Sequence, residues 1–446
     1  GRMRVGVIGA GAAGLCAVRN LRKYELDVVA FEKASNVGGT WEIKNDSSSM
    51  YDGLRTNLPS RVMEFPDFPF ISDSSFPTHQ QVNSYLHQYA IHFDLMPYIQ
   101  LNACVLQTKY SKRLRKWTVV WSNLNDSTQN LDLFDRIIVC NGHYTVPQEP
   151  FDEIPGLREY SENNHGFLMH SHYYRTPKVF ADKENILSLG AGASGIDISI
   201  EIAQNLTNQS AKVYLSHRAC SFSKAGSVPY SRVQNLIQYP GLTRMEGTTA
   251  VFDDMGAEIK LENIDAILLC TGYQYSFPFL KAEQLDDDDD TPKVNVIDNF
   301  VEGLYRHVFL IEEPSLAFVG LPFQVAPFPL FHFQTRWIAA VFSGNKSLPS
   351  KEEMMLTYKE ELEQLNERQI PIRHGHKMGD RQWEYNRIIS DLAGTENDIP
   401  VRKSMYVDCG QSRRADPVTY RNRKYIQFGP HESDWRVVVN GVDETL

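Results

Sequence analysis

The strongest constraint in this chain of 446 residues is a glycine loop that occurs twice, each time directly after a short apolar run. The first glycine loop is GAGAAG at residues 9–14, and the second is GAGASG at residues 190–195. A helix-like stretch and then another apolar run follow each loop, so both copies have the order strand, loop, helix, strand. Such units bind the pyrophosphate of a dinucleotide against glycine backbone and a helix N-terminus. We therefore predict an α/β fold with two Rossmann-like dinucleotide-binding domains.

The spacing of the remaining strands indicates that the second domain is inserted into the first. An apolar run ending in a glycine turn closes each unit, at residues 135–142 and 264–272. A passage rich in proline follows the earlier of these runs and is typical of a crossover between domains. We predict a discontinuous first domain made of residues 1–150 and 298–446, with residues 151–297 forming the second.

The residues that end the second strand of each unit differ in charge. Glu32 can accept hydrogen bonds from a ribose diol but would repel a 2′-phosphate, which suits FAD or NAD. Arg218 can pair with a 2′-phosphate through two hydrogen bonds, and Ser216 can add a hydroxyl donor, which suits NADPH. A surface arginine at a strand end is the alternative interpretation of Arg218. FAD with NADPH is the combination used by enzymes that transfer hydride to a flavin.

Composition and cysteine spacing exclude several functions. The net charge of −10 argues against a general nucleic-acid binder. No cysteine lies between Cys16 and Cys104, and the sequence has no CxxC pair, which excludes a flavin disulfide reductase and indicates no zinc site. The sequence has no run of 18 or more apolar residues, so it predicts no membrane-spanning helix.

Two close histidine pairs, His170 with His172 and His374 with His376, could suggest a metal site. Neither pair has a cysteine or carboxylate set at ligand spacing. We expect surface histidines there and no bound metal.

Further motifs accompany the two loops. They are GGTW at residues 38–41, LRTNLP at 54–59, TGY at 271–273 and QTRW at 334–337. With these motifs the chain resembles the flavin-containing monooxygenases as far as about residue 345. The fingerprint of that family falls on residues 164–174, with Gly166, His170 and Tyr174 in place but Asn164 where an aromatic is expected. Tyr174 instead of tryptophan looks more like an N- or S-oxygenase than a Baeyer–Villiger enzyme.

The resemblance implies a mechanism as well as a fold. NADPH would reduce FAD, NADP⁺ would stay bound, and the flavin would form a C4a-hydroperoxide that oxygenates a soft nucleophile in a dry site. Asn57 matches the active-site asparagine of the family and is the expected catalytic residue, because its neutral amide offers two donors and one acceptor. A turn asparagine before Leu58-Pro59 is the alternative. For His170 we favour a linker or hinge over a general base.

The expected cofactor contacts combine these motifs. The predicted FAD-binding residues are Gly9, Gly11, Ala13, Gly14, Glu32, Lys33, Gly39, Thr40, Trp41, Asn57 and Gln324. The predicted NADPH-binding residues are Gly190, Gly192, Ser194, Gly195, Ser216 and Arg218.

The compact length without a membrane anchor looks most like the insect branch of the family, which includes soluble pyrrolizidine-alkaloid (senecionine) N-oxygenases. We therefore expect N-oxide formation from a tertiary amine or alkaloid for detoxification, with O₂ as co-substrate and no nucleic-acid partner. Alternatives are an S-oxygenase, a Baeyer–Villiger monooxygenase or an NADPH oxidase that releases peroxide. The protein would be extracellular if a signal peptide preceded Gly1, or else cytoplasmic. The sequence determines neither the substrate nor whether the chain forms a homo-oligomer.

Overall fold

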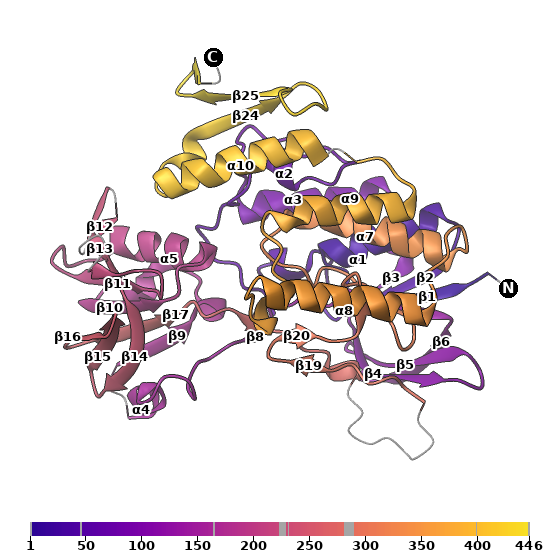
Figure 1. The fold of residues 1–446 in the computed structure, drawn as a ribbon, viewed down its shortest axis with the longest axis horizontal. Helices are drawn as coiled ribbons and strands as arrows, with labels where there is room; N and C mark the ends of the chain where they lie inside the picture. The colour runs from indigo at the N-terminus through magenta and orange to yellow at the C-terminus, as the bar shows by residue number, and fades with distance from the viewer. Residues whose placement is uncertain are drawn as a thin grey trace.

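Two mostly parallel sheets, each packed against helices, lie side by side in the molecule (Figure 1). The computed structural model describes residues 2–44, 47–163, 166–222, 229–230, 232–280, 290–397 and 399–444. We call residues 2–147 and 273–397 the outer unit, residues 148–272 the inserted unit and residues 399–444 the C-terminal segment. The inserted unit lies at the left of Figure 1, and the C-terminal segment, in yellow, lies along the top.

The outer unit is organised on a seven-stranded sheet of order β21-β22-β23-β7-β1-β2-β3. Its strands are β1 (Arg4–Ile8), β2 (Asp27–Phe31), β3 (Ile99–Gln100), β7 (Arg136–Val139), β21 (Leu304–Tyr305), β22 (Phe309–Leu310) and β23 (Leu316–Phe318). β1 pairs in parallel with β2 and with β7, and β23 pairs in parallel with β7. These central strands read as continuous apolar runs because both faces of the sheet are buried, one against helices and the other against the antiparallel strands that carry Trp117 and Phe134.

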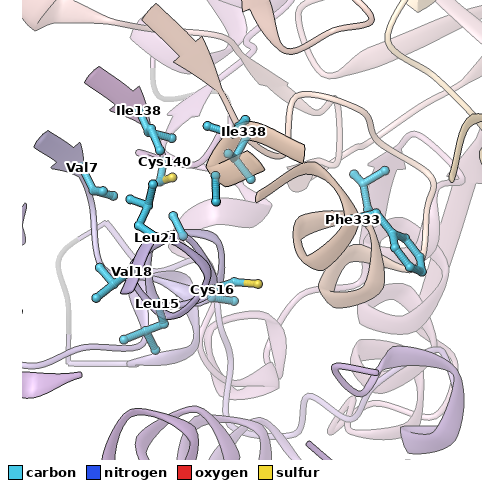
Figure 2. Close-up of a cluster of buried hydrophobic side chains, with 14 of the residues drawn as sticks. Val7, Leu15, Cys16, Val18, Leu21, Ile138, Cys140, Phe333 and Ile338 are labelled. Carbon is cyan, nitrogen blue, oxygen red and sulfur yellow. The ribbon is translucent and has the colours of Figure 1, made fainter. Parts of the chain in front are cut away.

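Helices of the outer unit build its largest core. They are α1 (Ala12–Lys23), α2 (Ser60–Met63), α3 (His79–His92), α7 (Pro327–Phe342), α8 (Lys351–Glu367) and α9 (Arg381–Ala393). Figure 2 shows Val7 and Ile138 of the sheet, Leu15 of α1 and Ile338 of α7 in one buried cluster. α7 begins at Pro327. Proline is compatible with a first helical turn, where its missing N–H has no partner to lose.

The segment after β3 forms an antiparallel sheet of β4 (Ala103–Ser111), β5 (Lys116–Asn123) and β6 (Gln129–Phe134). Tyr275 and Phe277 pack in the same core cluster as Trp117 of β5. The chain crosses to the inserted unit through β8 (Val146–Pro147) and returns through β18 (Tyr273–Gln274), and these two strands pair with each other. The domain boundary at residue 297 stays a prediction. Directly after β18, the side chains already pack in the core of the outer unit.

The inserted unit repeats the outer one. Its sheet has the order β12-β13-β11-β10-β17-β9, formed by β9 (Phe167–His170), β10 (Asn185–Leu189), β11 (Lys212–Ser216), β12 (Pro229–Tyr230), β13 (Val233–Tyr239) and β17 (Ala266–Leu269). α5 (Ala193–Gln204) follows β10, as α1 follows β1, and α4 (Leu157–Glu162) precedes β9. A small antiparallel sheet of β14 (Gly241–Glu246), β15 (Thr249–Asp254) and β16 (Ala257–Leu261) extends it. The predicted α/β fold with an inserted second dinucleotide unit is confirmed.

The C-terminal segment contains α10 (Ile399–Ala415), β24 (Arg423–Gln427), β25 (Trp435–Val439) and β26 (Val442–Asp443). Its core includes Val62 and Phe76 of the outer unit, so it is packed onto that unit. The remaining short elements are η1 (Gly39–Trp41), η2 (Met96–Tyr98), η3 (Ser171–Tyr173), η4 (Pro177–Phe180), η5 (Pro278–Leu280), η6 (Ile372–His374), η7 (Tyr420–Asn422), β19 (Val296–Ile297) and β20 (Phe300–Val301). Within the described ranges, every helix is too short or too polar to cross a bilayer.

Candidate cofactor and active site

The first glycine loop is shaped by contacts that exclude side chains. Gly9 has a φ of 102°, and a Cβ there would lie 2.4 Å from the carbonyl oxygen of Cys140. A Cβ on Gly14 would lie 1.9 Å from the carbonyl oxygen of Gly9, so only glycine lets α1 start this close to β1. A Cβ on Gly11 would lie 3.3 Å from the Cα atom of Gly39. The GAGAAG and GGTW turns therefore face each other with bare backbone, which fits a bound pyrophosphate.

The second glycine loop repeats this geometry almost atom for atom. Gly190 has a φ of 105° and a Cβ there would lie 2.3 Å from the Cys270 carbonyl oxygen, while a Cβ on Gly195 would lie 1.9 Å from the Gly190 carbonyl oxygen. Gly192 differs, because a Cβ there would meet no atom within 4 Å. Its φ of −71° also suits any residue. The fold therefore needs Gly190 and Gly195, whereas open space at Gly192 fits the close approach of a ligand phosphate to the helix N-terminus.

Glu32 is held at the edge of the first glycine loop. Its carboxylate is 7% exposed, and it accepts hydrogen bonds from the backbone N–H groups of Ala10 and Ala34, both at 2.8 Å. Burial raises the pKa of Glu32, and the two backbone donors act in the opposite direction. The side chain is therefore fixed beside the loop, where a ribose hydroxyl acceptor is expected.

The strand end after β11 presents one exposed and one buried side chain. Arg218 is exposed and lies beside Gly241, where an added Cβ would be 3.3 Å from the Cγ atom of the arginine. Ser216 is buried; its hydroxyl donates to the Pro240 carbonyl at 2.6 Å and accepts from the Leu242 N–H at 3.1 Å. Arg218 is thus free to reach a phosphate, whereas Ser216 anchors the neighbouring turn. The role of Ser216 as a donor to NADPH stays a prediction.

The other predicted FAD contacts lie on several loops of the outer unit. The Thr40 carbonyl accepts from the Ser48 hydroxyl at 2.5 Å, and the Trp41 ring lies edge to face with Phe328 at a centroid distance of 6.4 Å. Lys33 reaches the Ser47 hydroxyl at 3.0 Å.

Gln324 lies on a separate loop of the same unit. It is exposed, has a φ of 54°, and accepts through its carbonyl from the Gly379 N–H at 3.0 Å. Asparagine and a few polar residues tolerate such a backbone conformation better than branched residues do. Its contact with FAD stays a prediction.

Asn57 lies where the three parts of the chain meet. It is half-buried, and its carbonyl accepts from the Cys409 thiol at a sulfur–oxygen distance of 3.6 Å. The carbonyl oxygens of the two preceding residues, Arg55 and Thr56, accept from the guanidinium of Arg421. No motif surrounds Arg421, and these two carbonyl partners lie 365 and 366 positions away in the chain, so no local sequence pattern indicates its role.

The expectation of surface histidines is wrong for His170, His172 and His376, which are 1%, 3% and 1% exposed. His170 accepts at Nδ1 from the His172 N–H at 3.0 Å, so its Nε2 proton is donated to the Gly272 carbonyl at 3.1 Å. This side chain therefore ties the end of β9 to the turn where the chain returns to the outer unit. Burial lowers the pKa of His170 to about 4.

A metal site does not emerge from these histidines. In the part of the chain that the structure describes, no group of three or more histidine, cysteine, aspartate or glutamate side chains could hold an ion. Asn164, the leading position of the fingerprint, lies outside the described residues.

Comparison with known proteins agrees with this geometry. The family model for flavin-binding monooxygenase-like proteins matches residues 2–230 and 229–408. The chain belongs to the flavin-containing monooxygenase family. A relative from Arabidopsis thaliana, flavin-containing monooxygenase FMO GS-OX-like 4, is 37% identical over 94% of this chain and 93% of its own. FAD and NADPH are the cofactors of this family, so the predicted pair of cofactors is confirmed.

Solved structures extend the comparison. The S-allyl-L-cysteine S-oxygenase of Allium sativum is 34% identical, with a TM-score of 0.83 over 94% of each chain. Tmm from a Pelagibacter strain is 23% identical, with a TM-score of 0.77 over 97% of this chain and 95% of that one, and shows the shared fold. These findings confirm a flavin-dependent monooxygenase of the predicted family, and the resemblance to insect alkaloid N-oxygenases stays a prediction.

The contrast between Gly192 and Gly195 yields a testable prediction. Gly192→Ala is expected to change the free energy of unfolding by no more than about 1 kcal/mol, the usual scale for a helix N-cap. It is also expected to raise the KM for NADPH by about ten- to a hundredfold, because a methyl group would clash with the phosphate and weaken its binding by about 1–3 kcal/mol. Urea unfolding and steady-state kinetics measure the two effects.

Gly195→Ala is the matched contrast, since its methyl group would strike backbone within the protein. It is expected to destabilise the inserted unit while FAD content is retained. Equal stability losses in the two variants, or an unchanged KM in Gly192→Ala, would contradict the assignment of Gly192 to the ligand.

Proposed function

We propose that this flavin-dependent monooxygenase uses NADPH and O₂ to transfer one oxygen atom to a soft nucleophile, with a thioether sulfur as the first candidate. The observation that supports sulfur is the similarity along 94% of the chain to an S-allyl-L-cysteine S-oxygenase. When bound, reduced FAD supplies the activation of O₂. A thioether offers a free lone pair at neutral pH, whereas a tertiary amine offers one only in its unprotonated form.

The residues of this chain would have distinct roles in that reaction. The first glycine loop and Glu32 would hold FAD, and the second glycine loop with Arg218 would hold NADPH. Asn57 would orient a polar group of the reacting complex through its amide without adding charge. The packing of the inserted unit and the C-terminal segment around residues 51–57 would exclude water, which otherwise diverts the reduced cofactor to peroxide.

N-oxygenation of a tertiary amine or alkaloid, the expectation from the sequence, is the second candidate. Tyr174, a fully buried residue whose hydroxyl donates to Glu201 at 2.6 Å, supports N- and S-oxygenation equally against a Baeyer–Villiger reaction. Tryptophan, the residue associated with Baeyer–Villiger enzymes at this position of the fingerprint, could not make that oxygen–oxygen contact.

One experiment separates these outcomes. The FAD-loaded protein is supplied with NADPH and ¹⁸O₂ and offered S-allyl-L-cysteine, other thioethers, tertiary amines, a pyrrolizidine alkaloid and cyclic ketones. Mass spectrometry identifies the labelled product, and peroxide is measured in parallel. We expect a labelled sulfoxide in near-stoichiometric amount with NADPH consumed. A labelled N-oxide alone would favour the second candidate, and peroxide without any labelled product would favour an NADPH oxidase.

A further inference from the structure

One arginine of the C-terminal segment joins three distant parts of the chain. Arg421, in η7, has a side chain that is 16% exposed. Its guanidinium donates to the Asp197 carboxylate at 2.5 and 3.3 Å. It also donates to the carbonyl oxygens of Thr56 at 2.9 Å and Arg55 at 3.3 Å. A planar guanidinium can serve a carboxylate and two carbonyls at once, whereas a lysine ammonium is a single point charge.

Asp197 connects this arginine to the second glycine loop. It lies in α5, whose first residue directly follows Gly192, so carboxylate and loop are part of one rigid helix. One turn further along α5, Glu201 accepts from the Tyr174 hydroxyl at 2.6 Å. A Cβ on Gly53 would lie 2.0 Å from the Oε1 atom of Glu201. The same face of α5 therefore meets both Arg421 and the chain just before Asn57.

Residues 51–57 form the segment that carries Asn57. The N-terminal end of this segment also packs against the inserted unit. The Tyr51 ring packs edge to face with the Tyr174 ring at 5.4 Å, and Tyr51 belongs to the core cluster of the inserted unit. The Asp52 N–H donates to the Arg175 carbonyl at 2.9 Å. In sequence this segment belongs to the outer unit, yet its contacts place it against the inserted unit and the C-terminal segment.

We propose that Arg421 is a positioning residue that couples NADP(H) binding at the start of α5 to the placement of Asn57. The proposal rests on the proposed function for the nucleotide and for the role of Asn57. A nucleotide that orders the N-terminus of α5 also orders Asp197. The Asp197 carboxylate binds the guanidinium of Arg421, and this guanidinium binds the backbone carbonyls of Arg55 and Thr56. Without the arginine, NADPH would still bind and reduce the flavin. Asn57 would lose its fixed position, and more of the consumed O₂ would be released as peroxide instead of being transferred to the substrate.

Arg423 provides a matched control. Its guanidinium pairs with Asp408 at 3.1 Å and Glu444 at 2.6 Å, both in the C-terminal segment. Arg421→Met and Arg423→Met each remove an arginine of similar side-chain exposure, 16% and 20%, from the same segment, and each breaks an ion pair. Only the first releases the carbonyls of Arg55 and Thr56. Asp197→Asn removes the carboxylate charge that pairs with Arg421. This variant tests the proposal if Arg421→Met fails to fold.

The first measurement is the ratio of peroxide to oxygenated product at saturating NADPH. We expect this ratio to rise about tenfold in Arg421→Met and Asp197→Asn, the scale for losing a charged hydrogen bond, with the KM for NADPH changed less than the ratio. Arg423→Met should change the ratio less than about twofold. The double variant Arg421→Met/Asp197→Asn should raise the ratio no more than the single variant with the larger effect, since both substitutions break the same interaction. Unchanged ratios in both single variants would overturn the proposal.

The second measurement does not depend on turnover. Hydrogen–deuterium exchange of the FAD-loaded protein is recorded with and without NADP⁺, and binding of NADP⁺ is measured by calorimetry. We expect NADP⁺ to slow exchange in residues 51–57 of the unaltered protein and of Arg423→Met, but not in Arg421→Met that still binds NADP⁺. Persistent protection in Arg421→Met would overturn the coupling. A protein that shows the protection but oxygenates nothing would refute the proposed function and leave the coupling intact.

Discussion

Asn57→Asp is expected to lower the rate of oxygenated product formation by about 10²–10³-fold, the usual cost of losing a donor aimed at developing charge. The carboxylate has nearly the same size as the amide but offers no N–H donor and adds a negative charge. Asn57 is half-buried, so that charge would be poorly solvated. The rate of sulfoxide or N-oxide formation at saturating NADPH, measured by mass spectrometry, checks this expectation.

Controls separate a chemical role of Asn57 from a structural one. The contact of Cys409 is with the backbone carbonyl of Asn57, so the substitution leaves this packing in place. FAD content and the KM for NADPH should therefore stay within about twofold, since the glycine loops that are proposed to bind the two cofactors are elsewhere in the chain. Asn57→Gln keeps the amide but displaces it by one methylene and should be intermediate. An Asn57→Asp protein with unaltered product formation would show that Asn57 is only a turn residue.

Mild acid is expected to destabilise the protein strongly, because buried histidines are neutral in the folded state. Burial lowers the pKa of His170 to about 4 and that of His332 to about 3, and the pKa of His376 lies well below 6.5. For His332, burial and nearby arginines outweigh the Asp67 carboxylate 3.6 Å away, which favours the proton. The unfolded chain takes up protons at these sites near pH 6.5, whereas the folded protein does so only at lower pH.

The sign and size of the effect follow from this difference. Stability contributed by the neutral histidines is present above about pH 6.5 and is lost as the pH falls toward 4. Each site costs about 1.4 kcal/mol per pH unit in this window, so three sites cost roughly 4 kcal/mol per unit. That is a large share of the 5–15 kcal/mol of a typical domain. Buried Glu64, whose pKa is raised by burial, acts in the opposite direction.

Urea unfolding between pH 7 and pH 5 measures this loss. His332→Gln should make the dependence of the unfolding free energy on pH shallower by about one proton. A free energy of unfolding that is constant between pH 7 and pH 5 would contradict the neutral, buried state of these histidines.

The two glycine loops were the part of the site most accessible to sequence reasoning. Gly9 and Gly190 need a positive φ, and Gly14 and Gly195 leave no room for a Cβ, so their identity is dictated by contacts within a few residues or with the adjacent strand. The strand ends at Glu32 and Arg218 follow from the same local order of elements. Local constraints of this kind leave a visible pattern in the sequence.

Other features left no such pattern. Apolar and aromatic residues between 275 and 280 could belong to either unit by composition, and only packing assigns them to the outer one. His376 stands in a polar stretch that is typical of a surface loop, yet it is buried and accepts from the Val301 N–H at 3.0 Å. In such cases the partner, not the neighbouring sequence, decides whether a polar side chain can be buried.

The sequence by itself determined the α/β class, the duplicated dinucleotide units and the pair of cofactors, and it predicted which loop serves each cofactor. These depend on backbone conformation and on residues close in the chain. The tertiary structure alone decided how Asn57 is held, because Arg421 and Asp197 come from segments separated by 224 residues and meet only after both units and the C-terminal segment have packed. Long-range polar contacts have no periodicity or fixed spacing, so their partners become apparent only when the chain is folded.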